Sequence, residues 1–283
     1  MSKLYAVGDV HGDLTRLRIV LTNAGILSAN QWAAGDATLV FIGDLLNRGP
    51  KGFETILFVR RLETEAAEAG GKVICLAGNH EAMVLAMVAH CMGDFAHSDV
   101  SKIFDLNKGD IDTVYRLTES PEVLDWLRKR PFMYVEKRVL FQHPDSVEFF
   151  KYVLPDGTLE EMNIRALEML STGEGAWDVF YEMTGEGYSR RYWDCAISED
   201  DRDANITSHM ARFDVDLIVH GHTLHKKSKP KVYYDGKIVN IDGAMSIYYN
   251  RNPYRGFVWE HIEDEQTESD PPEAGAEGLD IES

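Results

Sequence analysis

The sequence has few cysteines, no long apolar run and a shortage of basic residues. Its three cysteines, Cys75, Cys91 and Cys195, are odd in number and far apart, which favours reduced thiols over disulfide bonds. No run of eighteen apolar residues is present, so a membrane-spanning helix is not expected. The first residues, MSKLYAVGDV, lack the charged and apolar regions of a signal peptide. Together these absences predict a soluble, cytoplasmic protein.

Acidic residues outnumber basic ones, and the formal net charge is -18. Nucleic-acid backbones and anionic membranes repel such a chain, so neither is an expected partner. Residues Glu263–Ser283 hold nine acidic residues and no Lys or Arg, which accounts for half of that net charge. Low hydrophobicity, two adjacent prolines and like charges predict that 263–283 is a disordered acidic tail with a solubilising role.

Short apolar runs followed by polar turns organise the first third of the chain. Strands are expected at Leu4–Val7, Thr38–Ile42 and Lys72–Ala77, with amphipathic helices between them. The polar turns that follow these strands hold Asp9, Asp44 and Asn79, which recur at intervals of 35 residues. That interval is about one βαβ unit. Parallel strands joined in this way bring their polar turns to one edge of a sheet.

The pattern changes from helices to strands beyond Pro131. Residues 81–130 look largely helical, and a helical stretch is also expected at Glu160–Leu170. Segment 145–203 is long and mixed, and it is a candidate for covering a site. Later strands, which predict a more antiparallel second sheet, are expected at Phe132–Val135, Arg138–Gln142, Leu217–Val219, Val232–Tyr234, Ile238–Ile241 and Gly256–Trp259.

Residues that can bind metal follow several of the apolar runs. Carboxylates, an amide and imidazoles occur there at Asp9, His11, Asp44, Asn79, His143 and His222. Any one of these short motifs alone is weak evidence, because Asp-x-His is common by chance. Mixed nitrogen and oxygen ligands suit Mn, Fe or Zn better than Mg or Ca.

Five motifs in order resemble the signatures of the calcineurin-like metallophosphoesterases, in their phosphoprotein-phosphatase branch. They are GDVHG, GDLLNRG, GNHE, a histidine after an apolar run, and GHT, within residues 4–259. The phrases GDVHGDLTRLRIVLTNAGIL, GGKVICLAGNHEAM and VNIDGAMSIYY are most similar to bacterial Shewanella-like phosphatases, and GDLLNRGP is similar to the diadenosine tetraphosphatases. The resemblance implies an α/β fold in which two sheets form a sandwich flanked by helices, within a catalytic domain of residues 1–262.

The resemblance also implies a role for each site residue. Two divalent metal ions would be held by Asp9 and His11 on one side and by Asn79, His143 and His222 on the other, with Asp44 bridging. Such a pair turns a bridging water into a hydroxide that attacks phosphorus in line. Arg48 would bind the phosphate oxygens, and His80 would act as the acid for the leaving oxygen. Asn79 and either Arg190 or Arg191 complete the expected substrate-binding set.

The chain departs from the branch at three positions. Leu224 replaces the last histidine of the wider group, and His225 is expected to point elsewhere. His143 is followed by Pro144-Asp145, where the branch has glycine. Asn47 replaces an aspartate that orients the acid histidine. We expect Asn47 to accept a hydrogen bond from His80 without adding charge, which favours good leaving groups such as phenolate or nucleotide phosphate.

The favoured function is metal-dependent hydrolysis of phosphate monoesters on phosphoproteins, at serine, threonine or tyrosine. One alternative is hydrolysis of nucleotides or dinucleoside polyphosphates, which Asn47 and GDLLNRGP favour. Another is a non-catalytic scaffold of the same fold, which is disfavoured because the metal-binding residues are present. Tyr248, Tyr249 and Tyr254 are expected to pack between strands more readily than to bind ligands, although the resemblance implies that the C-terminal region borders the substrate cleft.

Overall fold

Two sheets stack on one another, and both faces are buried in the strands Leu4–Val7, Thr38–Phe41 and Val139–Gln142. The computed structural model describes residues 2–184, 199–225, 227, 229–249 and 256–262. In the first sheet, of order β11-β1-β4-β5, the parallel strands are β1 (Leu4–Val7), β4 (Thr38–Phe41) and β5 (Lys72–Cys75), and β11 (Val258–Glu260) pairs antiparallel to β1. The second sheet has the order β6-β7-β8-β10-β9, with β6 at Met133–Glu136, β7 at Val139–Gln142, β8 at Leu217–His220, β9 at Lys231–Tyr233 and β10 at Ile238–Asn240.

The alternation of side chains along each strand divides the core into two layers. Leu4 and Ala6 on β1 pack toward the second sheet, where they join Phe141 and Val219 in one apolar cluster. Tyr5, the neighbour of both on β1, packs on the opposite face with the helices. Both faces of the first sheet are therefore covered, which explains why its strands read as continuous apolar runs.

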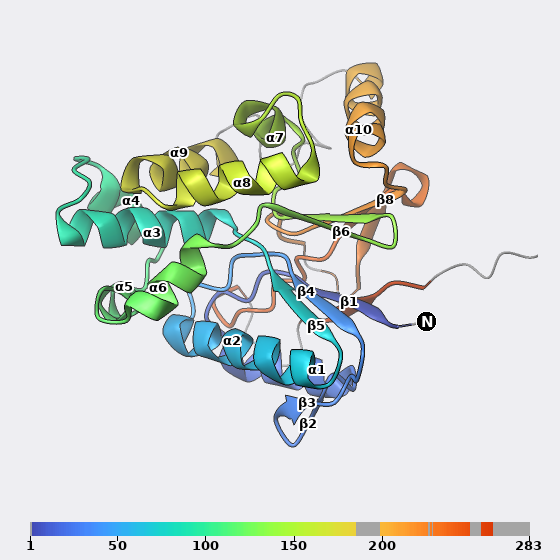
Figure 1. Cartoon of the computed structure of the whole chain (residues 1–283), viewed down its shortest axis with the longest axis horizontal. Helices are drawn as coiled ribbons and strands as arrows, with labels where there is room; N and C mark the ends of the chain where they lie inside the picture. Colours follow the sequence, from blue (N-terminus) through green and yellow to red (C-terminus); the bar gives the residue numbers. More distant parts are fainter. Residues whose placement is uncertain (1, 185–198, 226, 228, 250–255, 263–283) are drawn as a thin grey trace, which may run out of the picture.

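Helices cover the outer face of each sheet (Figure 1). α1 (Leu14–Asn23) and α2 (Gly52–Glu68) lie against the first sheet, next to a short hairpin of β2 (Leu27–Ser28) and β3 (Gln31–Trp32). Helices α7 (Glu148–Val153), α8 (Leu159–Leu170), α9 (Gly173–Thr184) and α10 (Glu199–Phe213) lie beyond the second sheet. The remaining helices are α3 (Asn79–Met92), α4 (Val100–Leu106), α5 (Ile111–Thr118) and α6 (Pro121–Arg128), and a 3₁₀ turn, η2, spans Tyr234–Gly236.

The expected α/β sandwich is confirmed, but two details of the second half differ from expectation. Its sheet is mixed, because β7, β8 and β10 run parallel and only β6 and β9 pair antiparallel with their neighbours. The last strand, β11, joins β1 in the first sheet instead. It follows that β1, which begins the chain, is a central strand with a partner on each side.

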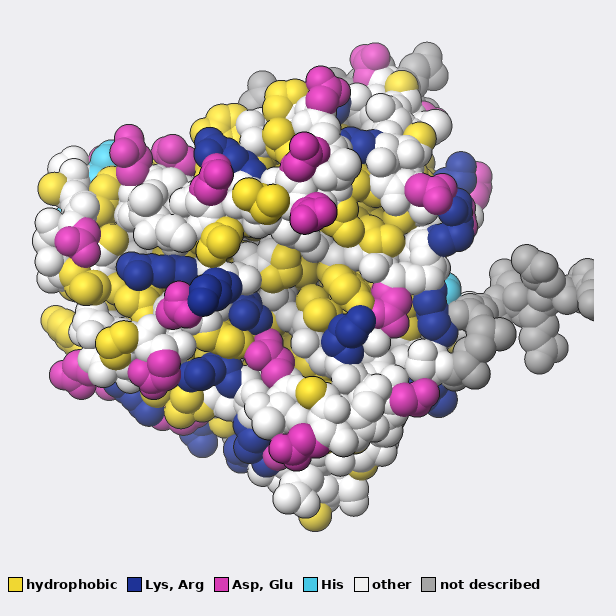
Figure 2. Space-filling view, viewed as in Figure 1, with side chains coloured by type: hydrophobic (Ala, Val, Ile, Leu, Met, Phe, Trp, Pro, Cys, Tyr) yellow, Lys and Arg dark blue, Asp and Glu magenta, His cyan; other side chains and the backbone are white. Residues whose placement is uncertain are grey.

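Charges of both signs are interspersed on the face of the molecule in Figure 2. Within the described ranges, no helix is both long and apolar enough to cross a membrane.

The expected tail, 263–283, lies outside the described residues, as do Arg190, Arg191 and Tyr254. Of the segment expected to cover a site, residues 145–184 form α7–α9, and α9 packs along α3.

Candidate functional site

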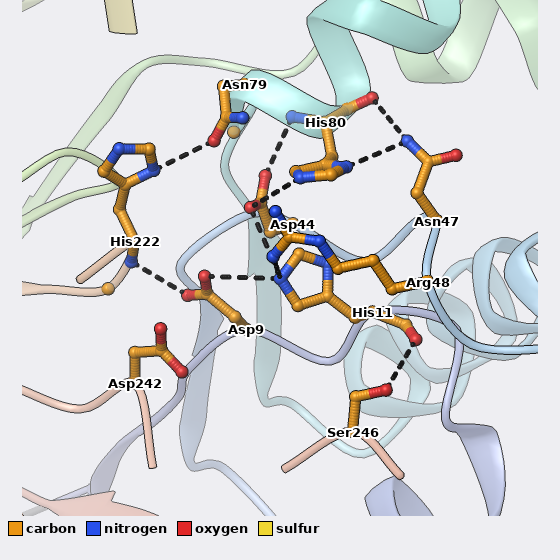
Figure 3. Close-up of polar contacts among 12 residues, drawn as sticks. Asp9, His11, Asp44, Asn47, Arg48, Asn79, His80, His222, Asp242 and Ser246 are labelled. Carbon is orange, nitrogen blue, oxygen red and sulfur yellow. Dashed lines mark hydrogen bonds and ion pairs between the residues drawn. The ribbon is translucent and has the colours of Figure 1, made fainter. Parts of the chain in front are cut away.

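Strand ends from both sheets meet at one edge, and the expected metal-binding residues lie there (Figure 3). Asp9 follows β1, Asp44 follows β4, and Asn79 begins α3 just after β5. His143 and His222 follow β7 and β8, two parallel strands of the second sheet. Backbone hydrogen bonds join these turns, because His11 N donates to Asp44 O and Gly221 N donates to His143 O.

One group of ligand atoms comes from His11, Asp44 and His80, which all lie within 4.8 Å of one another. His11 donates from Nδ1 to the carbonyl oxygen of Leu46 at 3.1 Å, so its Nε2 carries the lone pair in the neutral ring. That atom lies 3.8 Å from Asp9 Oδ2 and 3.7 Å from Asp44 Oδ2. A donated Nδ1 hydrogen that leaves Nε2 for the ligand is the usual arrangement of a metal-binding histidine.

A second group brings together His143, His222 and the shared Asp44. His143 Nδ1 donates to Ile42 O at 3.0 Å, which leaves the lone pair of Nε2 toward the site. This Nε2 lies 3.1 Å from Asn79 Oδ1 and 3.4 Å from Asp44 Oδ1. Asn79 Oδ1 is also 2.9 Å from His222 Nδ1. Since three acceptors converge here, a cation fits the space between them.

The buried carboxylates also favour cations. Burial, followed by the charges of Asp242 and Asp44, raises the pKa of Asp9 well above its usual range. Asp9 and Asp44 are both almost fully buried, where like charges repel strongly unless positive charge lies between them. The residues present therefore fit divalent cations with mixed nitrogen and oxygen ligands.

Glu81 holds the turns that carry the ligands. Its carboxylate accepts hydrogen bonds from the backbone nitrogens of Asp44, Leu45 and Gly78 at 2.7–2.8 Å. Glu81 thus fixes the GNHE turn through Gly78 and also holds the turn after β4. Pro144 and Asp145 do not move His143 out of the site, since Gln142 donates to Pro144 O and Thr223 donates to the Asp145 carboxylate.

The contact between Asn47 and His80 differs from expectation in its direction. Asn47 Oδ1 accepts from the backbone nitrogen of Asp110 at 2.9 Å, so Nδ2 is the end that faces His80 Nδ1, at 3.0 Å. Asn47 therefore donates to His80 instead of accepting from it. His80 Nδ1 is the acceptor, and its proton lies on Nε2, which is buried without a hydrogen-bond partner among the described residues. Burial, followed by the charge of Arg48, lowers the pKa of His80 well below its usual range.

Arg48 lies at the wall of a cavity of about 310 Å³ that opens over these ligands. Its Nη1 donates to His11 Nε2 at 3.0 Å. The guanidinium lies 5.1 Å from the ring centre of Tyr249 and 6.0 Å from that of Tyr248. The residues that line the cavity are Arg48, Leu106, Asn107, His222, Thr223, Leu224, Tyr248 and Tyr249.

Sequence reasoning missed the place of the two tyrosines. Tyr248 and Tyr249 line the cavity instead of packing between strands, and the Tyr249 hydroxyl lies 3.4 Å from His11 Nε2. The signals for this place were their position in the VNIDGAMSIYY phrase and the resemblance, which implies that the C-terminal region borders the substrate cleft. Leu106 and Asn107, from the end of α4, gave no signal at all. His225 points away, toward the carbonyl oxygen of Asn240, as expected.

Two stacked sheets with acidic and imidazole side chains at shared strand ends have the architecture of a metal-dependent hydrolase. The family model of the calcineurin-like phosphoesterases matches residues 2–226, and the chain belongs to this family. Members use divalent metal ions, which agrees with the ligand groups around Asp44.

Individual relatives agree with the family. "Shewanella-like protein phosphatase 2" of Arabidopsis thaliana is 40% identical over 82 residues, which cover 29% of this chain and 21% of that protein. A symmetrical bis(5'-nucleosyl)-tetraphosphatase of Janthinobacterium is 27% identical over 70% of this chain and 61% of its own length. The crystal structure of a cold-active protein-tyrosine phosphatase from a psychrophilic Shewanella has a TM-score of 0.67 at 24% identity, covering 88% of this chain and 73% of that one. At this sequence identity, the likeness to that structure shows a shared fold alone.

Proposed function

We propose that this chain is a metal-dependent phosphatase that hydrolyses phosphate monoesters of phosphoproteins. The observation that carries the proposal is the sharing of Asp44 between two groups of buried ligand atoms, with Arg48 at the wall of the cavity above them. Asp9, His11 and Asp44 would hold one ion, and Asp44, Asn79, His143 and His222 would hold the second. His80 lies within the first group but is not a proposed ligand, because its Nε2 carries the proton. When bound, a pair of Mn, Fe or Zn ions lowers the pKa of a coordinated water and neutralises charge on the phosphate.

The chain's own residues bind and orient the ester. Arg48 is half-buried, and its fork of donors binds two phosphate oxygens at once. His80 holds its proton on Nε2, from which it donates to the leaving oxygen. Asn47 keeps His80 in that tautomer, because its own oxygen is held by the backbone of Asp110. Arg190 or Arg191 is proposed as a second phosphate ligand.

The neutral state of His80 favours esters whose leaving group needs little protonation. We therefore place phosphotyrosine and other aryl phosphates ahead of phosphoserine and phosphothreonine as substrates. Dinucleoside polyphosphates are the second candidate, because their leaving group is a nucleotide phosphate and a tetraphosphatase is among the relatives.

A comparison of substrates with a matched variant tests the proposal. The purified protein, loaded with Mn, is assayed on phosphotyrosine, phosphoserine and phosphothreonine peptides and on diadenosine tetraphosphate, and its metal content is measured. We expect turnover of the peptides, with phosphotyrosine fastest. Asp44→Asn should lose metal and about 10²–10³-fold in kcat/KM, whereas Asp36→Asn, at an exposed position, should retain both.

Faster turnover of diadenosine tetraphosphate than of every peptide would favour the second candidate. A protein that binds no metal and hydrolyses neither class would be a scaffold, and the proposal would be wrong.

A further inference from the structure

The mouth of the candidate site carries apolar side chains that are open to solvent. Leu106 is 67% exposed and Tyr248 is 49% exposed, and both line the cavity that contains Arg48 and His222. A single exposed leucine is ordinary. Two large exposed side chains with apolar surface at the rim of one polar cavity are less usual. They offer a contact surface for the part of a substrate that extends beyond its phosphate.

The loop that presents Leu106 is attached to the catalytic turn after β4. Arg48 donates its backbone N–H to Lys108 O at 2.9 Å, and Asp110 donates its backbone N–H to Asn47 Oδ1 at 2.9 Å. Gly109 lies so close to the buried ring of Phe104 that an added Cβ would be 2.2 Å from a ring carbon. Residues 106–110, which are the last residue of α4 and the α4–α5 loop, are therefore held in one place relative to Arg48.

The tyrosine side of the cavity is fixed just as firmly. The backbone nitrogen of Ile247 donates to Asp13 Oδ2 at 2.8 Å, and the Ser246 hydroxyl donates to His11 O at 3.3 Å. Arg16, which is buried, donates from Nη1 to Met245 O at 2.7 Å. Tyr248 is thus positioned by the turn after β1, and Leu106 by the turn after β4.

We propose that Leu106 and Tyr248 are specificity-determining residues that contact a flat aromatic group carried by the phosphate. This inference rests on the proposed function, since it takes the phosphate to lie at Arg48. The cavity of about 310 Å³ is near the lower end of the range for small-ligand sites, about 300–1,000 Å³. We therefore expect a phenyl ring on the phosphate to contact Leu106 and Tyr248, and a short alkyl alcohol to make little contact with them.

The test compares an aryl ester with an alkyl ester. Wild type, Leu106→Ala and Leu106→Met are assayed with Mn on p-nitrophenyl phosphate, glycerol 2-phosphate and diadenosine tetraphosphate. Ile164→Ala is the control, because Ile164 is 51% exposed on α8 and does not line the cavity. We expect Leu106→Ala to lower kcat/KM for the aryl ester roughly tenfold, mainly through KM. The alkyl ester should change less than twofold, and Leu106→Met and Ile164→Ala should resemble wild type.

Equal losses on both esters, or no loss on either, would overturn the inference while leaving the proposed function in place. A loss confined to diadenosine tetraphosphate would show that Leu106 and Tyr248 contact a nucleobase, and it would also overturn the inference. Wild type that hydrolyses none of these substrates defeats the proposed function itself. Thermal unfolding of each variant confirms that it is folded.

Discussion

Asn47 is hydrogen-bonded through both ends of its side-chain amide, and this decides its effect on His80. An aspartate at this position would accept a hydrogen bond from Nδ1–H and stabilise the imidazolium form. Asn47 instead donates to Nδ1, since the backbone of Asp110 occupies its oxygen. A second proton on the ring would meet the amide hydrogens of Asn47. The neutral ring is therefore favoured by this contact as well as by burial.

Asn47→Asp should raise the activity on alkyl esters relative to aryl esters. The carboxylate adds the missing negative charge and allows His80 to act as a stronger acid, which matters most for a poor leaving group. We expect about a tenfold rise in the ratio of kcat on glycerol 2-phosphate to kcat on p-nitrophenyl phosphate.

The matched control is Asn107→Asp, which makes the same change within the same cavity. The native Asn107 donates from Nδ2 to Ile103 O and makes no contact with His80. Its ratio should stay at the wild-type value. An unchanged ratio in Asn47→Asp would show that His80 does not protonate the leaving group.

Glycines and residues with positive φ angles position the ligands in the turns after the strands. A Cβ at Gly78 would lie 2.3 Å from Asp44 Oδ1, and one at Gly221 would lie 2.3 Å from Asp9 Oδ1. Only glycine allows these carboxylates to approach the neighbouring turn so closely. Five site residues also have positive φ, which is uncommon outside glycine and concentrates strain at functional sites: His11, Asp44, Asn47, Arg48 and His222.

Gly221→Ala should disable the site more than it destabilises the fold. The added methyl group pushes the Asp9 carboxylate out of position, so we expect weaker Mn binding and about a 10²-fold loss of kcat/KM. Gly25→Ala is the control, because Gly25 has φ of +73° in open space. It should lose about 1 kcal/mol of stability and no activity. Titration with Mn and chemical denaturation measure the two effects, and full activity in Gly221→Ala would contradict this account.

At the scale of the whole molecule, helices pack on the outer face of the second sheet through buried polar contacts as well as apolar ones. His209 of α10 donates from Nε2 to Gln142 Oε1 at 2.9 Å, and its ring lies between Phe150 and Phe213. Gln142 is the last residue of β7, directly before His143. Attachment of α10 to the sheet thus reaches the edge of the candidate site.

The stability of the protein should fall as the pH drops below about 6.5. Burial lowers the pKa of His209 to about 3, so the unfolded chain takes up a proton there that the folded protein does not. This contribution is present above the unfolded pKa of about 6.5 and is lost as the pH falls, by about 2 kcal/mol at pH 5.

His209→Gln removes that proton uptake. Denaturant unfolding of wild type and His209→Gln at pH 7 and pH 5 should show a decrease for the variant that is about 2 kcal/mol smaller. His97→Gln, at a half-exposed position, should keep the wild-type decrease. Equal decreases in wild type and His209→Gln would disprove the assignment.

The positions of the strand ends, and the types of residue that follow them, could be predicted from the amino-acid sequence. Apolar runs and the turns after them are local features, so the strands before Asp9, Asp44 and Asn79 were predictable, as was their meeting at one sheet edge. The helices in 81–130 and the helix at 160–170 follow from local periodicity in the same way.

The contacts made by the residues at those strand ends depend on how distant segments pack, and the sequence did not predict them. The direction of the Asn47–His80 contact depends on Asp110, which lies 63 residues away in the chain. The pairing of β11 with β1 also depends on distant segments, as does the place of Leu106 in one cavity with Tyr248 and Tyr249. Periodicity and turn composition depend on residues that are close together in the sequence. Contacts between remote segments produce no such local pattern, so these contacts could not be predicted.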